Sequence, residues 1–383
     1  MAARAKAKGR KAVSASGAPA DAVAVAGRPE RVAGIILCGG SGTRMGRTRS
    51  HKVCASVAGR PAIVRLIGTL RRAGVDPLVV VVGHRAGDVV ETVGSAHPGV
   101  TFVYQRDRLG TGHAARIGMD ALAKFGCDGL VLITMGDKWF EPALVRSALQ
   151  RFHDARADLL LVTTPKTPKS SAGRLVAHPR NGILGIVELR DIQRGKVLED
   201  WLAMASRKAV LSRGALRAAG LERIRPAKKL WRALGPLATF SHGTGTVRAS
   251  ELAQAIRETG LTIQVGKATL DPDQIEQYSP TVNESVYIGR AAMLRETVCR
   301  IGRDNAQDEY YLTDLVELTA AGGKGRVVEH RLARVDDVMA FNTRGELQRI
   351  EARVRRVERA ATDFTAADKQ LASYTRTPAQ WLR

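Results

Sequence analysis

The sequence lacks the features that define several classes of protein. No run of apolar residues reaches the roughly 18 that a membrane-spanning helix needs, so no membrane protein is expected. Residues 1–31 hold no secretory hydrophobic region, which argues against export. The cysteines are few and show no metal-binding spacing: they are Cys38, Cys54, Cys127 and Cys299. Because scattered cysteines in apolar contexts are reduced core thiols by default, we expect a cytoplasmic protein without disulfides.

Aromatic and acidic residues are also scarce. Aromatic residues make up 4% of the chain while glycine is plentiful at 38 residues, which favours an α/β protein with many short turns over a tight all-β sandwich. Only 37 acidic residues oppose 60 basic ones, so the formal net charge is +23. Such a surface attracts polyanions such as nucleotides, nucleic acids or acidic membranes, and the charge alone does not choose among them.

Short apolar runs alternate with helical patterns from residue 32 onward. Buried strands are predicted at residues 32–38, 78–82, 100–104 and 130–134. A helix is predicted to open at Pro61 and to end before Gly74, since proline favours the first turn and glycine the position past the last. This alternation predicts an α/β fold with a Rossmann-like, mostly parallel sheet flanked by helices. Such sheets bind ligands beyond the carboxyl ends of their strands.

The remaining patterns divide the chain. We expect a disordered basic arm at 1–31, a core in two parts at 32–192 and 280–351, a mainly helical insertion at 193–279, and a C-terminal tail at 352–383. A smaller sheet region is predicted on either side of the turn-forming pair Asn181 and Gly182. The insertion is rich in lysine and arginine. No solenoid or hexapeptide repeat is present in the sequence.

A glycine-rich loop follows the first strand. Residues 37–45 read LCGGSGTRM, and Lys52 follows Arg44 by eight positions. Glycines let backbone N–H groups approach phosphate oxygens, while Arg44 and Lys52 would neutralise the charge that builds on a leaving pyrophosphate. The pattern is neither a P-loop nor an intact GxGxxG, and glycine after a strand is often only a tight turn.

The Gly-x-Gly-Thr-Arg-Met run followed by lysine resembles the sugar-1-phosphate nucleotidyltransferase family, typified by the uridyltransferase domain of bacterial N-acetylglucosamine-1-phosphate uridyltransferase. The resemblance recurs in Gln105 with LGTGHA at 109–114, in DNAQDEYYLTD at 304–314 and in FNTRGEL at 341–347. It covers roughly residues 32–351, except the insertion. No acetyltransferase activity is expected, because the hexapeptide repeat of the bifunctional members is missing from this sequence.

The nucleotide-binding and catalytic residues follow from these motifs. The resemblance implies that the nucleotide is held by Leu37, Gly39, Gly40, Gln105, Gly110 and Thr111, and that Arg44 and Lys52 are catalytic. A glutamine amide offers both a donor and an acceptor to the edge of a pyrimidine, although a solvated loop glutamine is the alternative for Gln105. His113 is interpreted as a packing or hydrogen-bonding residue outside catalysis.

A metal site is predicted beyond the strand at 130–134. Asp137 follows this strand, and a carboxylate in that position holds a hard, oxygen-binding cation beside phosphates, although it is sometimes only a helix cap. The resemblance adds Asn342 as the second ligand of Mg2+. The run at 304–314 is the most specific match, and it is interpreted as a recognition segment rather than a catalytic one.

The acceptor side departs from the family pattern. The resemblance implies that Gly173, Glu188 and Asn283 bind the sugar, and a carboxylate such as Glu188 can accept hydrogen bonds from two vicinal hydroxyls. The family usually continues Gly-Asp-x-Pro-Leu, where this chain has KWF at 138–140, and Asn283 lacks the preceding acid and following glycine of the family. The acceptor sugar is therefore left open.

The sequence predicts an enzyme of nucleotide-sugar biosynthesis that joins a nucleoside triphosphate, with UTP favoured, to a sugar 1-phosphate with Mg2+, releasing pyrophosphate. Cytidylyl or thymidylyl transfer is the close alternative. A noncatalytic regulator that binds nucleotide or nucleic acid on the same fold is the rival, with nucleic acid the less expected ligand. Three roles are left open for the insertion: it could cover the sugar pocket, recognise a larger phosphorylated acceptor or form an oligomer contact. Trp201 and Trp231 could anchor any of these.

Overall fold

The computed structural model describes residues 30–40, 50–321 and 325–374, with side chains up to residue 361. The chain divides into two units, Met1–Glu30 and Arg31–Arg383. The predicted basic arm lies outside the described residues, apart from Glu30 and Arg31. Every described helix and strand belongs to the second unit.

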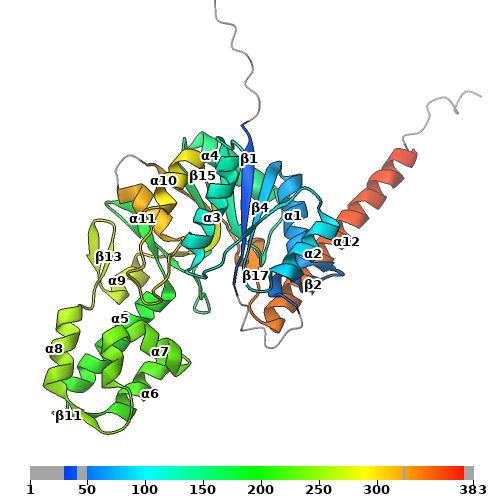
Figure 1. The fold of residues 1–383 in the computed structure, drawn as a ribbon. Helices are drawn as coiled ribbons and strands as arrows, with labels where there is room; N and C mark the ends of the chain where they lie inside the picture. The colour runs from blue at the N-terminus through cyan, green and yellow to red at the C-terminus, as the bar shows by residue number, and fades with distance from the viewer. Residues whose placement is uncertain (1–29, 41–49, 322–324, 375–383) are drawn as a thin grey trace, which may run out of the picture. The chain divides into compact units, whose positions relative to one another are not determined.

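The centre of the fold is a sheet whose middle strands run parallel (Figure 1). β1 (Val32–Cys38) lies between β4 (Val75–Val82) and β6 (Leu130–Met135), and β5 (Thr101–Tyr104) pairs with β4. All of these pairings are parallel, and β1 is buried along its whole length. Continuous apolar runs form such strands because both faces of the sheet are covered.

The other side of the sheet is mixed. β15 (Thr281–Arg290) runs antiparallel to β6, to β8 (Leu159–Pro165) and to β9 (Arg174–His178). β16 (Val327–Arg331) pairs with β8, and β10 (Gly182–Val187) pairs with β9 across a turn in which Gly182 has φ 69°. The smaller sheet region of the prediction is thus continuous with the large one, which has nine strands in all.

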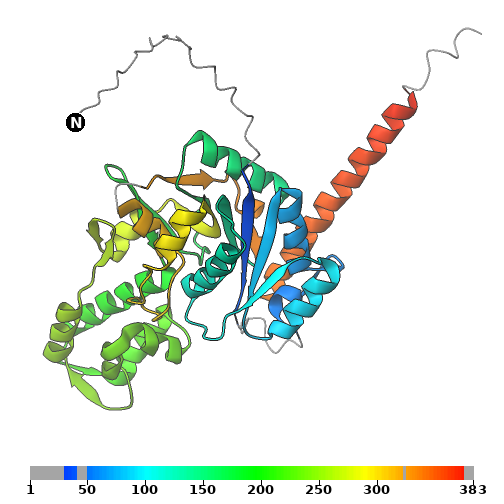
Figure 2. The same ribbon diagram turned by 45° about the horizontal axis from the view of Figure 1, so that its top comes forward.

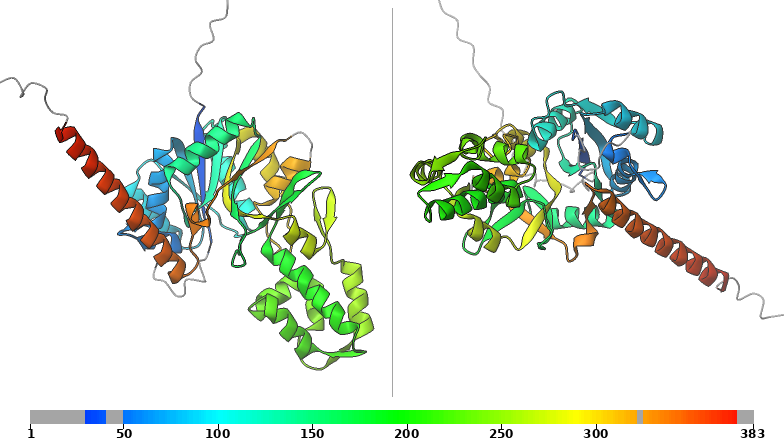
Figure 3. Two further views of the ribbon diagram at one scale, coloured as in Figure 1. Left: turned by 180° about the vertical axis from the view of Figure 1, so that it is seen from behind. Right: turned by 90° about the horizontal axis from the view of Figure 1, so that it is seen from below.

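Helices cover both faces of the sheet (Figures 1 and 3). One face carries α1 (Ala62–Arg72), α2 (Ala86–Ala96) and α4 (Pro142–Asp154), and the other carries α3 (Thr111–Lys124), α10 (Ala291–Val298) and α11 (Asp314–Ala321). Successive strand residues point to opposite faces, so Ile36 packs in the first core and Ile35 in the second. Helix α1 starts and ends beside Pro61 and Gly74, as the sequence predicts.

The region between β10 and β15 has its own core (Figure 2). It contains α5 (Leu189–Ala205), β11 (Val210–Ser212), α6 (Arg213–Arg223), α7 (Ala227–Leu234), the 3-10 helix Gly235–Phe240, β12 (Thr246–Arg248), α8 (Ala249–Thr259), β13 (Ile263–Val265), β14 (Ala268–Leu270) and α9 (Pro272–Gln277). Trp201 is fully buried there, and its Nε1 donates to the Leu216 carbonyl. The suggestion that Trp201 anchors a ligand or a second subunit is therefore wrong, because its ring is part of this core.

Short elements and one long helix complete the second unit. They are the 3-10 helix Lys52–Cys54, β2 (Ser56–Val57), β3 (Arg60–Pro61), β7 (Lys138–Trp139), the 3-10 helix Val335–Asp337, β17 (Met339–Ala340) and α12 (Arg344–Tyr374). Helix α12 runs through the predicted boundary at residue 352 (Figure 3). Its first turns pack Ile350 and Val354 against Val57 and Phe341. Among the described helices, none is long and apolar enough to span a bilayer.

Candidate functional site

The carboxyl ends of the parallel strands bring the predicted nucleotide residues together. Gly39 follows β1 and Gln105 follows β5. A Cβ atom on Gly39 would lie 2.3 Å from Gln105 Oε1, and one on Gly83 would lie 3.0 Å from the Gly39 backbone. A side chain at Gly39 would displace the Gln105 amide, and one at Gly83 would crowd the backbone that follows β1. The loop after β1 is thus pressed against the loops after β4 and β5.

Gln105 is buried and its amide is held in place. Its Nε2 donates to the Gly110 carbonyl at 3.1 Å and lies 3.2 Å from His113 Nδ1, while its backbone N–H donates to Val82. Gly110 has φ 114°, and a Cβ there would lie 2.5 Å from the Tyr310 carbonyl oxygen. The turn before α3 therefore requires glycine, and it fixes the position of Gln105.

The 304–314 run packs against this turn. Gly112 N–H donates to the Tyr310 carbonyl at 2.8 Å, Tyr310 N–H donates to the Leu109 carbonyl at 2.7 Å, and Leu312 N–H donates to Thr111 Oγ1 at 3.0 Å. Three hydrogen bonds thus join segments about 200 positions apart in the chain. The run therefore shapes the turn before α3 through its backbone.

These segments enclose a cavity of about 690 Å³. It brings together all the predicted nucleotide-binding residues: Leu37, Gly39, Gly40, Gln105, Gly110 and Thr111. Its other walls are Arg108, Ala114, Met135 and Glu309, together with Lys228, Lys229 and Arg232 of α7. The three α7 residues are absent from the predicted site, because nothing in their local sequence indicates which part of the core they approach.

Lys52, Asp137 and Asn342 meet beside this cavity. Lys52 Nζ donates to Asp137 Oδ2 and, at 3.2 Å, to Asn342 Oδ1. Asp137 is 8% exposed, and the residue before it, Gly136, packs against Cys38. The three side chains come from the 3-10 helix after β1, the end of β6 and the segment before α12. The predicted catalytic residue Lys52 thus contacts both predicted metal ligands. The other predicted catalytic residue, Arg44, lies outside the described residues.

Neighbouring residues hold two of these side chains in position. His51 is buried; its Nε2 lies 2.9 Å from the Gly40 carbonyl oxygen, and its backbone N–H donates to Asp88 at 2.7 Å. Burial is the main cause of the lowered pKa of His51, which favours the neutral ring. These contacts tie Lys52 to the glycine loop.

Asn342 is held by the start of α12. Glu346 Oε2 accepts from the backbone N–H groups of Asn342 and Thr343, at 2.6 and 2.9 Å, and Glu346 N–H donates to Thr343 Oγ1 at 3.2 Å. This reciprocal pair is a capping arrangement. The Thr-x-x-Glu spacing at 343–346 is the sequence signal for it, although Glu346 is absent from the predicted site.

The oxygen donors of Asp137 and Asn342 suit magnesium. Both engage a single positive charge, the Lys52 ammonium, so their oxygens already converge on a cation. Mg2+ prefers such oxygen ligands and is bound through one or two carboxylates together with phosphates and waters. Within the described residues, no group of three or more His, Cys, Asp or Glu side chains is placed to hold a metal. The residues present therefore fit a cation that is bound jointly by these two side chains and by the phosphate of a substrate.

The predicted sugar residues also lie together. Asn283 N–H donates to the Gly173 carbonyl at 2.9 Å, and a Cβ on Gly173 would lie 3.3 Å from Glu188 Oε1. The Asn283 amide is engaged within the protein, since Nδ2 donates to the Tyr287 hydroxyl at 2.6 Å and Oδ1 accepts from Ser285 N–H. Glu188 accepts from Thr313 Oγ1 at 3.2 Å.

Two carboxyl groups here have raised pKa values. Burial, followed by the nearby charge of Asp191, raises the pKa of Glu188 to about 7. Burial, followed by Glu317 and then Glu188, raises the pKa of Asp314 to about 7. Near neutral pH each group is therefore divided between its acid and its carboxylate form.

The residues that depart from the family pattern bind each other. Lys138 Nζ lies 2.8 Å from Glu284 Oε2, and Thr164 Oγ1 donates to the other carboxylate oxygen at 2.7 Å. Both side chains are largely buried, at 8% and 14% exposure. Lys138 follows Asp137 and Glu284 follows Asn283, so the pair links the metal side to the sugar side. The sequence marks both positions as unusual, but it gives no sign that they are partners.

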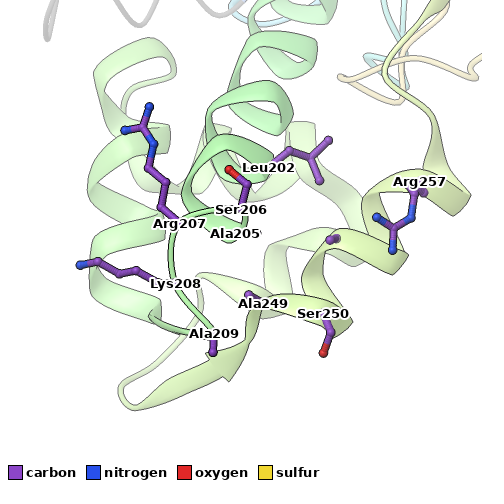
Figure 4. Close-up of a pocket in the computed structure, with 10 residues that line it drawn as sticks. Leu202, Ala205, Ser206, Arg207, Lys208, Ala209, Ala249, Ser250 and Arg257 are labelled. Carbon is purple, nitrogen blue, oxygen red and sulfur yellow. The ribbon is translucent and has the colours of Figure 1, made fainter.

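A second hollow, of about 700 Å³, lies on the region between β10 and β15 (Figure 4). Arg207, Lys208 and Arg257 line it. Their side chains point in different directions rather than toward one another (Figure 4). The hollow thus shows no convergent anion site.

Known proteins share both the sequence pattern and the fold. Residues 34–244 match the MobA-like NTP transferase domain. The chain is 29% identical over 330 residues to the bifunctional protein GlmU of Cutibacterium acnes, which covers 84% of this chain and 58% of that protein. It is also 29% identical over 321 residues to GlmU of Trichlorobacter lovleyi, covering 82% and 50%. The chain thus spans about half the length of the curated relatives it matches.

A solved structure supports the architecture. A Bacillus anthracis protein described as a glucose-1-phosphate thymidylyltransferase aligns with a TM-score of 0.51 at 16% identity, covering 85% of this chain and 95% of that one. At this identity the likeness concerns the fold. The predicted fold class and the family resemblance seen in the motifs are both confirmed.

Proposed function

The chain belongs to the family of MobA-like NTP transferase domains, and from this premise we propose that it transfers a nucleotidyl group from a nucleoside triphosphate to a sugar 1-phosphate. Pyrophosphate is the second product, and the reaction uses Mg2+ in the cytoplasm. The observation that carries the proposal is the meeting of Lys52, Asp137 and Asn342 beside a cavity lined by the predicted nucleotide residues.

The reaction is a displacement at the α-phosphorus. An oxygen of the sugar phosphate forms the new P–O bond while the bond to the β-phosphate bridging oxygen breaks, so the electron pair leaves with pyrophosphate. Lys52 neutralises charge on the reacting phosphates, and Arg44 is assigned to the leaving group. Because no covalent enzyme intermediate is needed, positioning and charge neutralisation supply most of the catalysis.

The cation is assigned to Asp137 and Asn342. When bound, Mg2+ would withdraw charge from the phosphate oxygens that it contacts. Glu346 orients Asn342 through its backbone, and the hydrogen bonds of His51 keep Lys52 beside the glycine loop. Lys52 donates to both side chains that are assigned to the cation, so its ammonium lies where it can also reach phosphate oxygens bound there.

We assign recognition of the base to Gln105, Gly110 and Thr111. UTP is the proposed donor, favoured over CTP and TTP. Gln105 is buried, with its amide nitrogen bonded to the Gly110 carbonyl and its amide oxygen beside Gly39. A glutamine amide held in one orientation supports recognition of the edge of a base. The acceptor is assigned to Gly173, Glu188 and Asn283, where Glu188 would accept hydrogen bonds from sugar hydroxyls.

One observation favours a second candidate, a nucleotide-binding regulator without turnover. The Asn283 amide is occupied by Tyr287 and Ser285, and the unusual Lys138 and Glu284 are occupied by each other. Such an acceptor side would bind a sugar phosphate weakly while the nucleotide side stays intact. Pyrophosphate release separates the two candidates.

The test is a matrix of nucleoside triphosphates against sugar 1-phosphates with Mg2+, read by pyrophosphate release and by nucleotide-sugar formation. Asp137→Ala serves as the blank, and Asp120→Ala, an exposed aspartate on α3, is the matched control. We expect turnover that Asp137→Ala abolishes and Asp120→Ala retains. Tight triphosphate binding without turnover against any acceptor would favour the regulator, and turnover that survives Asp137→Ala would overturn the site.

A further inference from the structure

Helix α7 of the insertion forms part of the wall of the nucleotide cavity. Lys228, Lys229 and Arg232 line the same cavity as Gly39, Gly40 and Gln105. Basic residues also line the second hollow of this region, where their side chains point in different directions (Figure 4). The α7 residues differ in that the cavity they line is the one that contains the predicted nucleotide residues.

The cavity wall is strongly positive. Arg108 joins the three α7 cations, and among the described residues that line the cavity the single carboxylate is that of Glu309. Glu309 lies 3.7 Å from Arg232, with side-chain exposures of 32% and 55%, so this exposed pair offsets little of the charge. A neutral ligand would leave these cations facing one another. An anion with several charges would relieve that repulsion.

The first turn of α7 carries positive charges, which are unfavourable at the N-terminus of a helix. Its first turn contains no acidic residue, it contains Lys228 and Lys229, and Pro226 at its N-cap makes no side-chain capping bond. The helix dipole is positive at this end, so two lysines there are unfavourable for stability, while an anion would be favoured. A helix selected for stability alone would have the opposite charge pattern.

The rest of α7 is anchored, so its cations are held at the cavity rather than carried on a loose arm. Leu230, Ala233 and Leu234 are buried in the core that contains Trp201. Ala306 joins the same core, and its N–H donates to Asp191 at 2.8 Å. The 304–314 run, which shapes the turn before α3, therefore also fastens the insertion to the cavity.

We propose that the α7 cations, Lys228 and Arg232 foremost, bind the phosphate chain of the nucleoside triphosphate, so that the insertion completes the donor site. This inference rests on the proposed function for the identity of its ligand. Phosphate is also present on the acceptor, but the α7 cations share a cavity with Gln105, Gly110 and Thr111, whereas Glu188 and Asn283 do not line it. The donor is therefore the ligand that the geometry selects. This role differs from the three that the sequence left to the insertion, because its ligand is the nucleotide rather than the sugar, a larger acceptor or a second subunit.

The experiment compares nucleotides that differ only in phosphate number. UMP, UDP and UTP are titrated calorimetrically into the wild type and into Lys228→Gln/Arg232→Gln, without acceptor and at low salt. Lys208→Gln/Arg257→Gln, which removes the same charge from the other hollow of the insertion, is the matched control. Glucose 1-phosphate is titrated separately to detect an acceptor role. If UTP gives no turnover in the substrate matrix, the triphosphate that does is used with its own mono- and diphosphate.

We expect the α7 variant to weaken UTP binding roughly tenfold, UDP binding less and UMP binding less than twofold, because partly exposed charge contacts to phosphate are lost. The control should change each affinity less than twofold, and added salt should shrink the difference. An equal loss for UMP and UTP, or a loss confined to glucose 1-phosphate, would overturn the inference.

The inference and the proposed function can fail separately. Turnover in the wild type with unchanged UTP affinity in the α7 variant would overturn the inference and leave the transferase intact. A phosphate-dependent loss of affinity in a protein without turnover would support the inference and remove the transferase in favour of the regulator. A wild type that neither binds nor turns over any triphosphate overturns both.

Discussion

The donor and acceptor sides of the site use polar residues in opposite ways. On the proposed donor side, Lys52 binds Asp137 and Asn342 next to a cavity of about 690 Å³, and the Lys52 and Asp137 side chains are themselves only 15% and 11% exposed. On the acceptor side, Asn283 bonds with Tyr287, and Lys138 pairs with Glu284 inside the protein. The charged groups of the donor side thus lie next to a cavity that can hold a ligand, whereas the polar groups of the acceptor side are engaged with protein partners.

The two sides recognise their ligands by different interactions: the donor side by charge and the acceptor side by the placement of hydrogen-bonding groups. A phosphate chain presents the same charges whichever base or sugar is attached, so a glycine loop and fixed cations serve many substrates. A sugar is distinguished by the placement of its hydroxyls, which requires oriented neutral groups supported by packing. The Lys138 and Glu284 pair supplies such support. Changes on the acceptor side should therefore act on stability first and those on the donor side on rate.

The largest expected effect is on stability and comes from the acceptor side. Lys138→Met leaves the Glu284 carboxylate largely buried without its cation, so the free energy of unfolding should fall by about 3 to 5 kcal/mol. Urea denaturation measures the change. Lys138→Met/Glu284→Gln should recover most of it, because Thr164 can still donate to the amide oxygen. A single variant that loses less than about 1 kcal/mol would show that the pair does not support this side.

A comparable effect on rate is expected from the donor side. Lys52→Ala should reduce turnover by roughly 100- to 1000-fold, corresponding to about 3 to 4 kcal/mol of lost stabilisation of the reacting phosphates. Because Lys52 and Asp137 are only 15% and 11% exposed, the same substitution should also lower the free energy of unfolding, so turnover is compared per folded protein. Steady-state pyrophosphate release tests the rate, with Lys124→Ala, an exposed lysine on α3, as the control. Near-normal turnover of Lys52→Ala would remove this residue from the mechanism.

The acidic cluster gives a pH test of the acceptor side. Glu188 has a folded-state pKa raised to about 7, so the folded protein binds a proton more tightly than the unfolded chain does. Its stabilising contribution is complete below its ordinary pKa of 4.5 and is lost as the pH rises to about 7. Glu188→Gln should remove this loss and gain on the order of 2 kcal/mol at pH 8 relative to the wild type.

Thermal or urea unfolding across pH 4.5 to 8 measures the effect. Since the charge of Glu188 contributes to the raised pKa of Asp314, Glu188→Gln should also lower that second pKa. Adding Asp314→Asn should therefore flatten the curve further. A Glu188→Gln variant with the pH dependence of the wild type would show that this carboxyl titrates as it does in water.

The smallest effect is expected at the start of α12. Glu346→Ala removes the acceptor that holds the backbone of Asn342 and Thr343, at a cost of about 1 kcal/mol in stability. Because Asn342 is then less well positioned, the Mg2+ concentration for half-maximal turnover should rise several-fold. Glu351→Ala, on a later turn of α12, should leave the Mg2+ requirement unchanged. An unchanged requirement in Glu346→Ala would separate Asn342 from the metal.

Much of the fold could be predicted because its central strands carry local signals. The parallel strands β1, β4, β5 and β6 are short apolar runs, and each lies within a few residues of its predicted bounds. For the antiparallel β15, the sequence pattern predicts a strand only over 285–288, while the strand spans Thr281–Arg290. Its irregular pairing near Ser285, which has φ 53°, interrupts the alternation that marks a strand in the sequence. β16 has no counterpart in the prediction, since its half-exposed residues resemble those of a loop.

The sequence by itself determined the strand-and-helix alternation, the glycine loop and the residue types suited to phosphate and Mg2+, because these are fixed by neighbours along the chain. The tertiary structure decided which of them meet. Lys52 contacts Asn342 across 290 positions, Lys138 finds Glu284 across 146, and α7 reaches the cavity from within the insertion. Such contacts follow from strand order and from how helices pack on the sheet, and these depend on the free energy of the whole core rather than on any local pattern.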